Sequence, residues 1–183
     1  LDYDAEIPVA KAYTAADKLT VEYDESYGMA LVQVGAADGS DLCAVYFFME
    51  EADEDIVVPA GTYTIDDSWD YGTVLASTGY DAYSGQVAPS LYASCNAEGY
   101  LKLPMWFMVG GSVTVEKVDG KMKMEINAVN SYNQPIHITY DGTATALENV
   151  NVNVEGIRKQ IVDGQLVIIR DGKAYNAQGA QVK

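Results

Sequence analysis

The feature of this chain that most constrains its fold is a pair of alternating runs joined by the dipeptide Asp119-Gly120. In the second run, Lys121–Val129, apolar side chains at 122, 124, 126 and 128 alternate with polar ones. A two-residue period places the apolar side chains on one face of a strand and the polar ones on the other. Asp-Gly suits a tight turn that needs positive φ at both central residues. Residues 112–118 and 121–129 therefore predict a β-hairpin with one buried face.

The rest of the chain has the same character. Helical periodicity is nearly absent, and the only helix candidate is one turn at residues 15–18. Short apolar runs bounded by turn residues predict an all-β, antiparallel fold. A β-sandwich is the preferred architecture and a closed eight-strand barrel the alternative, because short hairpin connections fit both. The other expected strands are residues 7–13, 29–34, 42–49, 62–65, 101–109 and 135–140.

Residues 66–100 lack a clear period and are rich in Gly, Ser, Asp and Tyr. They predict long loops with one short strand at 73–76, and loops of this length are often functional. Rigid aromatic rings among small polar residues make good contact surfaces, which predicts a ligand-binding site. The alternative is that each ring packs over an end of the β-core. The predicted ligand-binding residues are Trp69, Tyr71, Tyr80, Tyr83 and Tyr92.

The charge balance narrows the range of partners. The 183 residues include 27 acidic and 11 basic side chains, for a net charge of −16. This balance argues against nucleic acid and anionic membrane surfaces as partners. No apolar run is long enough for a transmembrane segment. Because the chain opens with Leu1, we expect a processed or truncated chain, and a removed signal peptide with a lipid anchor would fit.

No catalytic, metal or cofactor site is predicted from the side chains. The lone His137 alternates with Ile136 and Ile138, which predicts a solvent-facing, structural histidine. Cys43 lies in an apolar run and Cys95 in a polar, loop-like stretch without metal-ligand spacing, so two separate thiols are expected.

Carboxylates cluster twice in the chain, and both clusters are interpreted as solvated turns. Calcium binding and a glycosidase pair are the alternatives. The clusters are Glu50, Glu51, Asp53, Glu54 and Asp55, and then Asp66, Asp67 and Asp70. The run Met105, Trp106, Phe107 and Met108 is typical of core, or of the lining of an apolar cavity inside a barrel.

The last 26 residues read as three short strands separated by Asp163-Gly164 and Asp171-Gly172. This segment resembles the C-terminal segments of secreted and surface proteins of Bacteroidetes. It is also similar to the early part of a type IX secretion sorting domain, in which a Tyr-Asn-x-x-Gly pattern recurs. Because the chain stops before the last strands of such a domain, a working sorting signal and a structural β-module remain alternatives. The matching residues are Gly164, Gln165, Ile168, Ile169, Arg170, Asp171, Gly172, Lys173, Tyr175, Asn176, Gly179, Val182 and Lys183.

The middle of the chain resembles secreted proteins of Bacteroides-type bacteria. The matching pieces are VPAGTYTIDD (58–67), GGSVTVEKVDGKMKMEI (110–126) and ITYDGT (138–143). The resemblance implies a calycin-like barrel or a β-sandwich. It also implies an exported protein in the periplasm, at the outer membrane or outside the cell.

These observations predict two parts and a function. Residues 1–148 are expected to form an antiparallel β domain. Residues 149–183 are expected to form a small β-hairpin module, too short for a core of its own. The expected function is that of an exported, non-enzymatic binding or interaction protein for a glycan or a protein. The alternatives are a barrel-type carrier of a small apolar ligand and, least favoured, a hydrolase that uses Asp66 and Asp67.

Overall fold

The chain divides into two compact units, residues 1–144 and 145–183. The computed structural model describes residues 10–77 and 90–144, and in the second unit the backbone of the strands between residues 152 and 182. The sequence placed the boundary between the two parts at 148/149. The described part of the chain contains no helix with the length and apolar character of a membrane span.

The first unit is built from strands, and its described residues contain no helix. The prediction of an all-β fold is confirmed. The strands are β1 (Lys11–Thr14), β2 (Lys18–Asp24), β3 (Met29–Gly35), β4 (Asp41–Phe48), β5 (Gly61–Asp66), β6 (Thr73–Leu75), β7 (Leu91–Cys95), β8 (Leu101–Phe107), β9 (Gly110–Val118), β10 (Lys121–Val129) and β11 (Pro135–Asp141).

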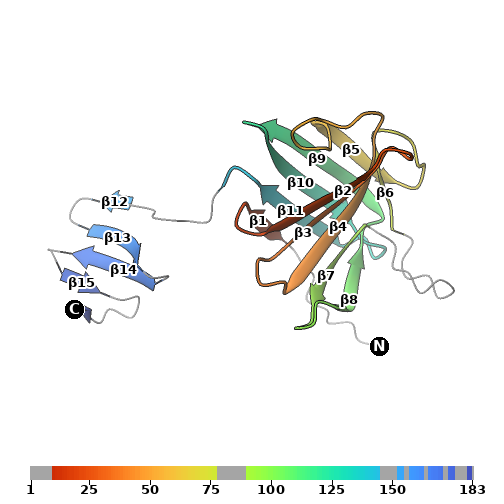
Figure 1. The fold of residues 1–183 in the computed structure, drawn as a ribbon. Helices are drawn as coiled ribbons and strands as arrows, with labels where there is room; N and C mark the ends of the chain where they lie inside the picture. Colours follow the sequence, from red (N-terminus) through yellow and green to blue (C-terminus); the bar gives the residue numbers. More distant parts are fainter. Residues whose placement is uncertain are drawn as a thin grey trace. The chain divides into compact units, whose positions relative to one another are not determined.

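These strands form one continuous sheet that curls into a half-barrel (Figure 1). The order is β1-β11-β10-β9-β5-β6-β4-β3-β2, and the β7–β8 pair branches from β4. Pairing is antiparallel except between β1 and β11 and between β5 and β6. The outermost strands of this order, β1 and β2, are joined by residues 15–17. Because so short a connection spans at most about 14 Å, the curl brings the two ends of the sheet together. This arrangement is intermediate between the predicted sandwich and the predicted closed barrel.

The hairpin predicted around Asp119-Gly120 is confirmed. Val118 pairs with Lys121, so the two residues between them form the whole loop. Asp119 has φ 52° and Gly120 φ 72°, the positive values that a tight hairpin turn requires. On β10 the predicted apolar face is buried: Met122, Met124, Ile126 and Ala128.

The curled sheet of this unit contributes one hydrophobic core cluster. β4 is buried over most of its length, which explains why its sequence is almost wholly apolar. The core side chains come from nearly every strand. The largest fully buried ones are Phe47, Met108, Ile126, Ile136, Ile138, Val32, Val34, Val45, Val58, Val74, Val113 and Val115.

Two strands of the first unit were not predicted. Residues 15–18 form no helical turn: the Asp17 carboxylate accepts the Thr14 amide at 2.8 Å in a turn, and β2 begins at Lys18. β2 ends the sheet order, so even its apolar positions stay partly exposed and its pattern is weak. β7 lies in a stretch predicted to be loop. Its Ala and Ser residues have low strand propensity, and pairing with β4 and β8 overrides that preference.

Two further predictions need correction. In the run from Met105 to Met108 only Met108 is fully buried, while the other three side chains are half-buried. The reason is that β8 pairs with β7 alone and therefore lies at an edge. Of the strand expected at residues 7–13, the structure describes only the end, and β1 runs on to Thr14.

The second unit is a five-stranded antiparallel sheet in the order β12-β13-β14-β15-β16. Val162 pairs with Gln165 and Arg170 with Lys173, so the strands that flank each predicted Asp-Gly turn are paired with each other, while the Asp-Gly residues themselves lie outside the described residues. Its strands are β12 (Val152–Val154), β13 (Ile157–Val162), β14 (Gln165–Arg170), β15 (Lys173–Tyr175) and β16 (Gln181–Val182).

Candidate functional site

Two of the predicted aromatic residues, Trp69 and Tyr71, lie on the connection between β5 and β6. Their side chains are 63% and 61% exposed. The Trp69 ring lies against the buried ring of Phe48, with a centroid separation of 5.4 Å and an interplanar angle of 36°. Trp69 therefore packs against a buried core ring while most of its side chain remains exposed to solvent.

The backbone around Trp69 is held by its own turn. The Asp66 carboxylate accepts the Ser68 amide at 3.0 Å, and the Ser68 hydroxyl accepts the Asp70 amide at 3.2 Å. Trp69 has φ 63°, in the left-handed region, which costs about 1–2 kcal/mol for a residue with a side chain. The hydrogen bonds of the turn thus hold the backbone of Trp69 in a left-handed conformation that a residue with a side chain otherwise avoids.

Tyr71 lies against the backbone of Gly28, in the turn between β2 and β3. A Cβ at position 28 would be 2.9 Å from Cε1 of Tyr71 and 2.6 Å from the Met49 carbonyl oxygen. Gly28 also has φ +60°. Glycine is therefore required here for two reasons, the close approach and the backbone conformation.

A surface pocket of about 560 Å³ opens beside Tyr71, and we call it the aromatic pocket. Tyr63 is buried at its wall, with its hydroxyl donating to the Pro59 carbonyl at 2.9 Å. Glu50 and Glu51 are exposed, and no ion pair or hydrogen bond of their carboxylates occurs among the described residues. The lining is apolar, aromatic and acidic, and it contains no basic residue. The lining residues are Met49, Glu50, Glu51, Pro59, Tyr63, Tyr71 and Gly72.

Of the other predicted contact residues the structure describes only Tyr92, which does not join this site. Tyr80 and Tyr83 lie outside the described residues. Tyr92 was predicted to be a loop residue at a contact surface, and it is instead 3% exposed in β7. The neighbouring strands β4 and β8 cover it, and its hydroxyl is used in the buried cluster described next.

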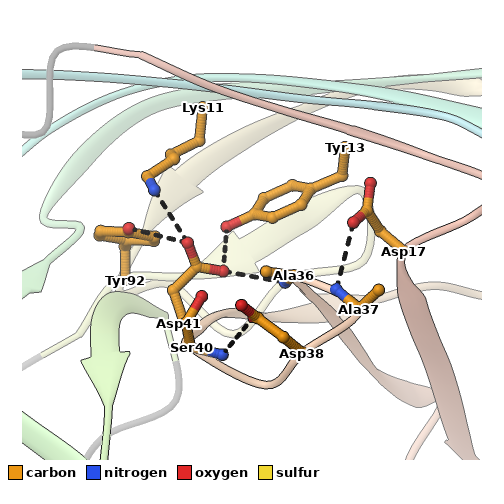
Figure 2. A network of polar contacts seen from close by, with 9 residues as sticks. All are labelled: Lys11, Tyr13, Asp17, Ala36, Ala37, Asp38, Ser40, Asp41 and Tyr92. Carbon is orange, nitrogen blue, oxygen red and sulfur yellow. Dashed lines mark hydrogen bonds and ion pairs between the residues drawn. The ribbon is translucent and has the colours of Figure 1, made fainter. Parts of the chain in front are cut away.

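A second cluster, the Asp41 network, surrounds the buried carboxylate of Asp41 (Figure 2). One carboxylate oxygen accepts the Tyr13 hydroxyl at 2.8 Å and the Ala36 amide at 2.9 Å. The other accepts the Lys11 ammonium at 2.9 Å and the Tyr92 hydroxyl at 3.2 Å. The donors come from β1, β7 and the turn between β3 and β4, so the network ties three separate segments to the start of β4.

The charges in this network are mutually stabilising. Burial by itself would raise the pKa of Asp41, but donors from Ala36, Lys11 and Tyr13 outweigh it and hold that pKa below its ordinary value. The hydrogen bond to Asp41 raises the pKa of Lys11. Burial raises the pKa of Tyr13 strongly. With two donors on each carboxylate oxygen, Asp41 has no acceptor position left for a ligand, and the network is structural.

The Asp41 network was not predicted from the sequence. Lys11, Asp41 and Tyr92 lie far apart in the chain, and none stands in a recognisable motif. The only local signal is that Asp41 begins an otherwise apolar run, where an acidic side chain must find buried partners.

The remaining reactive side chains have simple surroundings. Lys117 pairs with Asp53 at 3.0 Å and with Asp55 at 2.8 Å, so part of the first acidic cluster is neutralised. Among the residues described, no three His, Cys, Asp or Glu side chains are arranged to hold a metal ion. His137 is half-buried as a residue, with its side chain 43% exposed, and its ring nitrogen lies 3.0 Å from the Glu125 carboxylate.

Both cysteines are free, and burial raises the pKa of each thiol. Cys43 is buried in β4. Cys95 ends β7 and is partly exposed, so the loop expected around it is in part a strand.

Comparisons with known proteins give no match among protein-family models, curated proteins or solved structures. Function must therefore be argued from the two clusters themselves. The Asp41 network is closed to ligands. The aromatic pocket, together with the exposed Trp69 of the same β5–β6 connection, is the candidate functional site.

Proposed function

We propose that the protein is an exported, non-enzymatic binding protein that contacts a glycan or a protein through Trp69, Tyr71 and the aromatic pocket. Export is proposed from the sequence resemblances of the C-terminal segment and the middle of the chain. The contact surface is proposed from the geometry around Trp69.

The observation that carries the proposal is the exposure of two large rings that are already held in place. Trp69 and Tyr71 are both more than 60% exposed, one supported by Phe48 and the other by Gly28. Covering about 100 Å² of such apolar surface is worth roughly 2–3 kcal/mol. Since the loop needs no ordering on binding, little of that gain is lost to entropy.

Both ligand classes suit this surface. Aromatic faces stack on the C–H face of a sugar ring, and Tyr and Trp are enriched in the centres of protein interfaces. The carboxylates of Glu50 and Glu51 accept hydrogen bonds from hydroxyl or amine groups. The net charge of −16 disfavours polyanions of either class.

The two alternative functions gain no support from the described residues. A carrier needs an internal cavity, and most of the buried apolar side chains described in this unit, Phe47 and Met108 among them, belong to one core cluster. The hydrolase alternative uses Asp66 and Asp67: the Asp66 carboxylate is engaged with the Ser68 amide and hydroxyl, so Asp67 lacks a free second carboxylate in that pair.

The test is binding by the wild type and the double variant W69A/Y71A, probed first on a glycan array and a panel of extracellular proteins. Any ligand found should bind the double variant at least about tenfold more weakly, because two stacking surfaces are lost. The matched control is Y100A/Y132A, which removes two exposed tyrosines that do not line the pocket. Equal binding by both double variants would rule out this surface.

A further inference from the structure

The aromatic pocket combines three features that together select a positively charged ligand group. The Tyr71 ring is largely open to solvent, and a ring face attracts a cation. Pro59, which is half-buried at the pocket, supplies apolar surface on which an aliphatic stem can lie. Glu50 and Glu51 supply two carboxylates.

The carboxylates of the pocket differ from the paired acids of this unit. Asp41, Asp53, Asp55, Glu125 and Asp141 each have a cationic or histidine partner within 3.1 Å. Glu50 and Glu51 have none among the described residues, and the pocket lining contains no Lys, Arg or His. Their negative charge is therefore available to a partner.

We infer that the aromatic pocket receives the cationic end of a lysine or arginine side chain, so that the ligand is a protein with an exposed basic segment. This inference rests on the proposed function and names the ligand class for the same site. A volume of about 560 Å³ holds such a side chain along its whole length. Its charged end lies over Tyr71 and close to the two glutamates, while its stem lies along Pro59. A neutral glycan would leave the two carboxylates without a charge partner.

The experiment uses the full chain and isothermal titration calorimetry with four matched nonapeptides. The peptides share a Gly-Ser background and carry three residues of arginine, lysine, citrulline or glutamate. Citrulline has the shape of arginine without its charge. We expect the arginine and lysine peptides to bind, and the citrulline peptide to bind about tenfold more weakly or not at all. Raising the salt concentration should weaken arginine-peptide binding.

Two double variants distinguish the effect of charge at the pocket from the effect of the overall charge of the protein. E50Q/E51Q should weaken binding of the arginine peptide about tenfold. E98Q/E116Q removes the same charge from exposed positions outside the pocket and should leave affinity within about twofold. Both variants are expected to fold, since all four side chains are exposed.

Each other outcome overturns a different claim. No binding of basic peptides, equal binding of arginine and citrulline, or no effect of E50Q/E51Q would overturn the cationic pocket. If a neutral oligosaccharide then binds in a manner that needs Trp69 and Tyr71, the proposed function stands with a glycan ligand. If neither ligand class responds to W69A/Y71A, the proposed function fails as well.

Discussion

The Asp41 network and the aromatic pocket are made from similar residue types, tyrosines and carboxylates, yet they differ in how their polar atoms are used. Asp41 is 6% exposed, and both its oxygens are saturated by donors from three segments. At the pocket, Glu50 and Glu51 have no partner among the described residues, and Tyr71 is open to solvent.

This contrast in the use of polar atoms indicates that burial, rather than residue type, distinguishes a structural cluster from a recognition surface. A buried carboxylate must have partners, because the cost of leaving its charge unpaired exceeds most single stabilising interactions. At the surface water satisfies the same group and is displaced when a ligand arrives. The following changes test this contrast, from the largest expected effect on stability to the smallest.

Removing the central carboxylate should have the largest effect. Asp41→Ala leaves the Tyr13 and Tyr92 hydroxyls and the Ala36 amide without their acceptor, and should lower the free energy of unfolding by about 3–5 kcal/mol. Urea unfolding followed by far-UV circular dichroism measures it. Lys11→Ala is the control and should cost less, because Lys11 is 43% exposed and Asp41 keeps its other three donors. A loss below about 1 kcal/mol for Asp41→Ala would contradict the structural role of the network.

Lowering the pH should cause part of the same loss in the free energy of unfolding. The pKa of Asp41 in the folded protein lies below its ordinary value of 3.8. Its ionisation therefore stabilises the fold fully above about pH 4, and the contribution disappears as pH falls through the folded-state pKa. The stability difference between the wild type and Asp41→Asn should be constant from pH 7 to about pH 5 and shrink toward pH 2. A stability difference between the two proteins that grows as the pH falls would contradict a lowered pKa of Asp41 in the folded state.

A methyl group at Gly28 should disturb the support of Tyr71. Gly28→Ala places a Cβ within 2.9 Å of Tyr71 and 2.6 Å of a backbone oxygen at positive φ, and should cost about 1–3 kcal/mol. Gly72→Ala is the matched control, since Gly72 also has positive φ but a Cβ added there would have no neighbouring atom within 4 Å. Its cost should be limited to about 1 kcal/mol from the backbone. Equal thermal midpoints for the two variants would mean that Tyr71 does not pack on Gly28.

Changes at the pocket itself should have the smallest effect on stability. Trp69→Ala, Tyr71→Ala and E50Q/E51Q should each alter the free energy of unfolding by no more than about 0.5–1 kcal/mol, because the side chains are largely exposed. Urea midpoints measured beside those of Asp41→Ala give the comparison directly. A loss of about 3 kcal/mol or more at the pocket would place these residues with the Asp41 network as structural elements.

Local features of the chain were predictable because their cause lies in neighbouring residues. The β9–β10 hairpin follows from a two-residue period and from the φ preferences of Asp119-Gly120, and both are properties of adjacent residues. The antiparallel pairing of β13 with β14 and of β14 with β15 was predictable for the same kind of reason, because each pair of strands is close in sequence. The aromatic character of residues 69 and 71 also pointed to a surface site, although their support by Phe48 and Gly28 did not.

Sequence by itself determined the all-β class, the hairpin with its buried face, and the turns. Tertiary structure alone decided the strand character of β2 and β7, the curl that brings β1 toward β2, and the division of the tyrosines between core and surface. Tyr92 shows why: its position depends on β4, β8 and Asp41, all supplied by distant segments. Periodicity and turn chemistry act over a few residues, whereas burial is set by whatever the rest of the chain places on top.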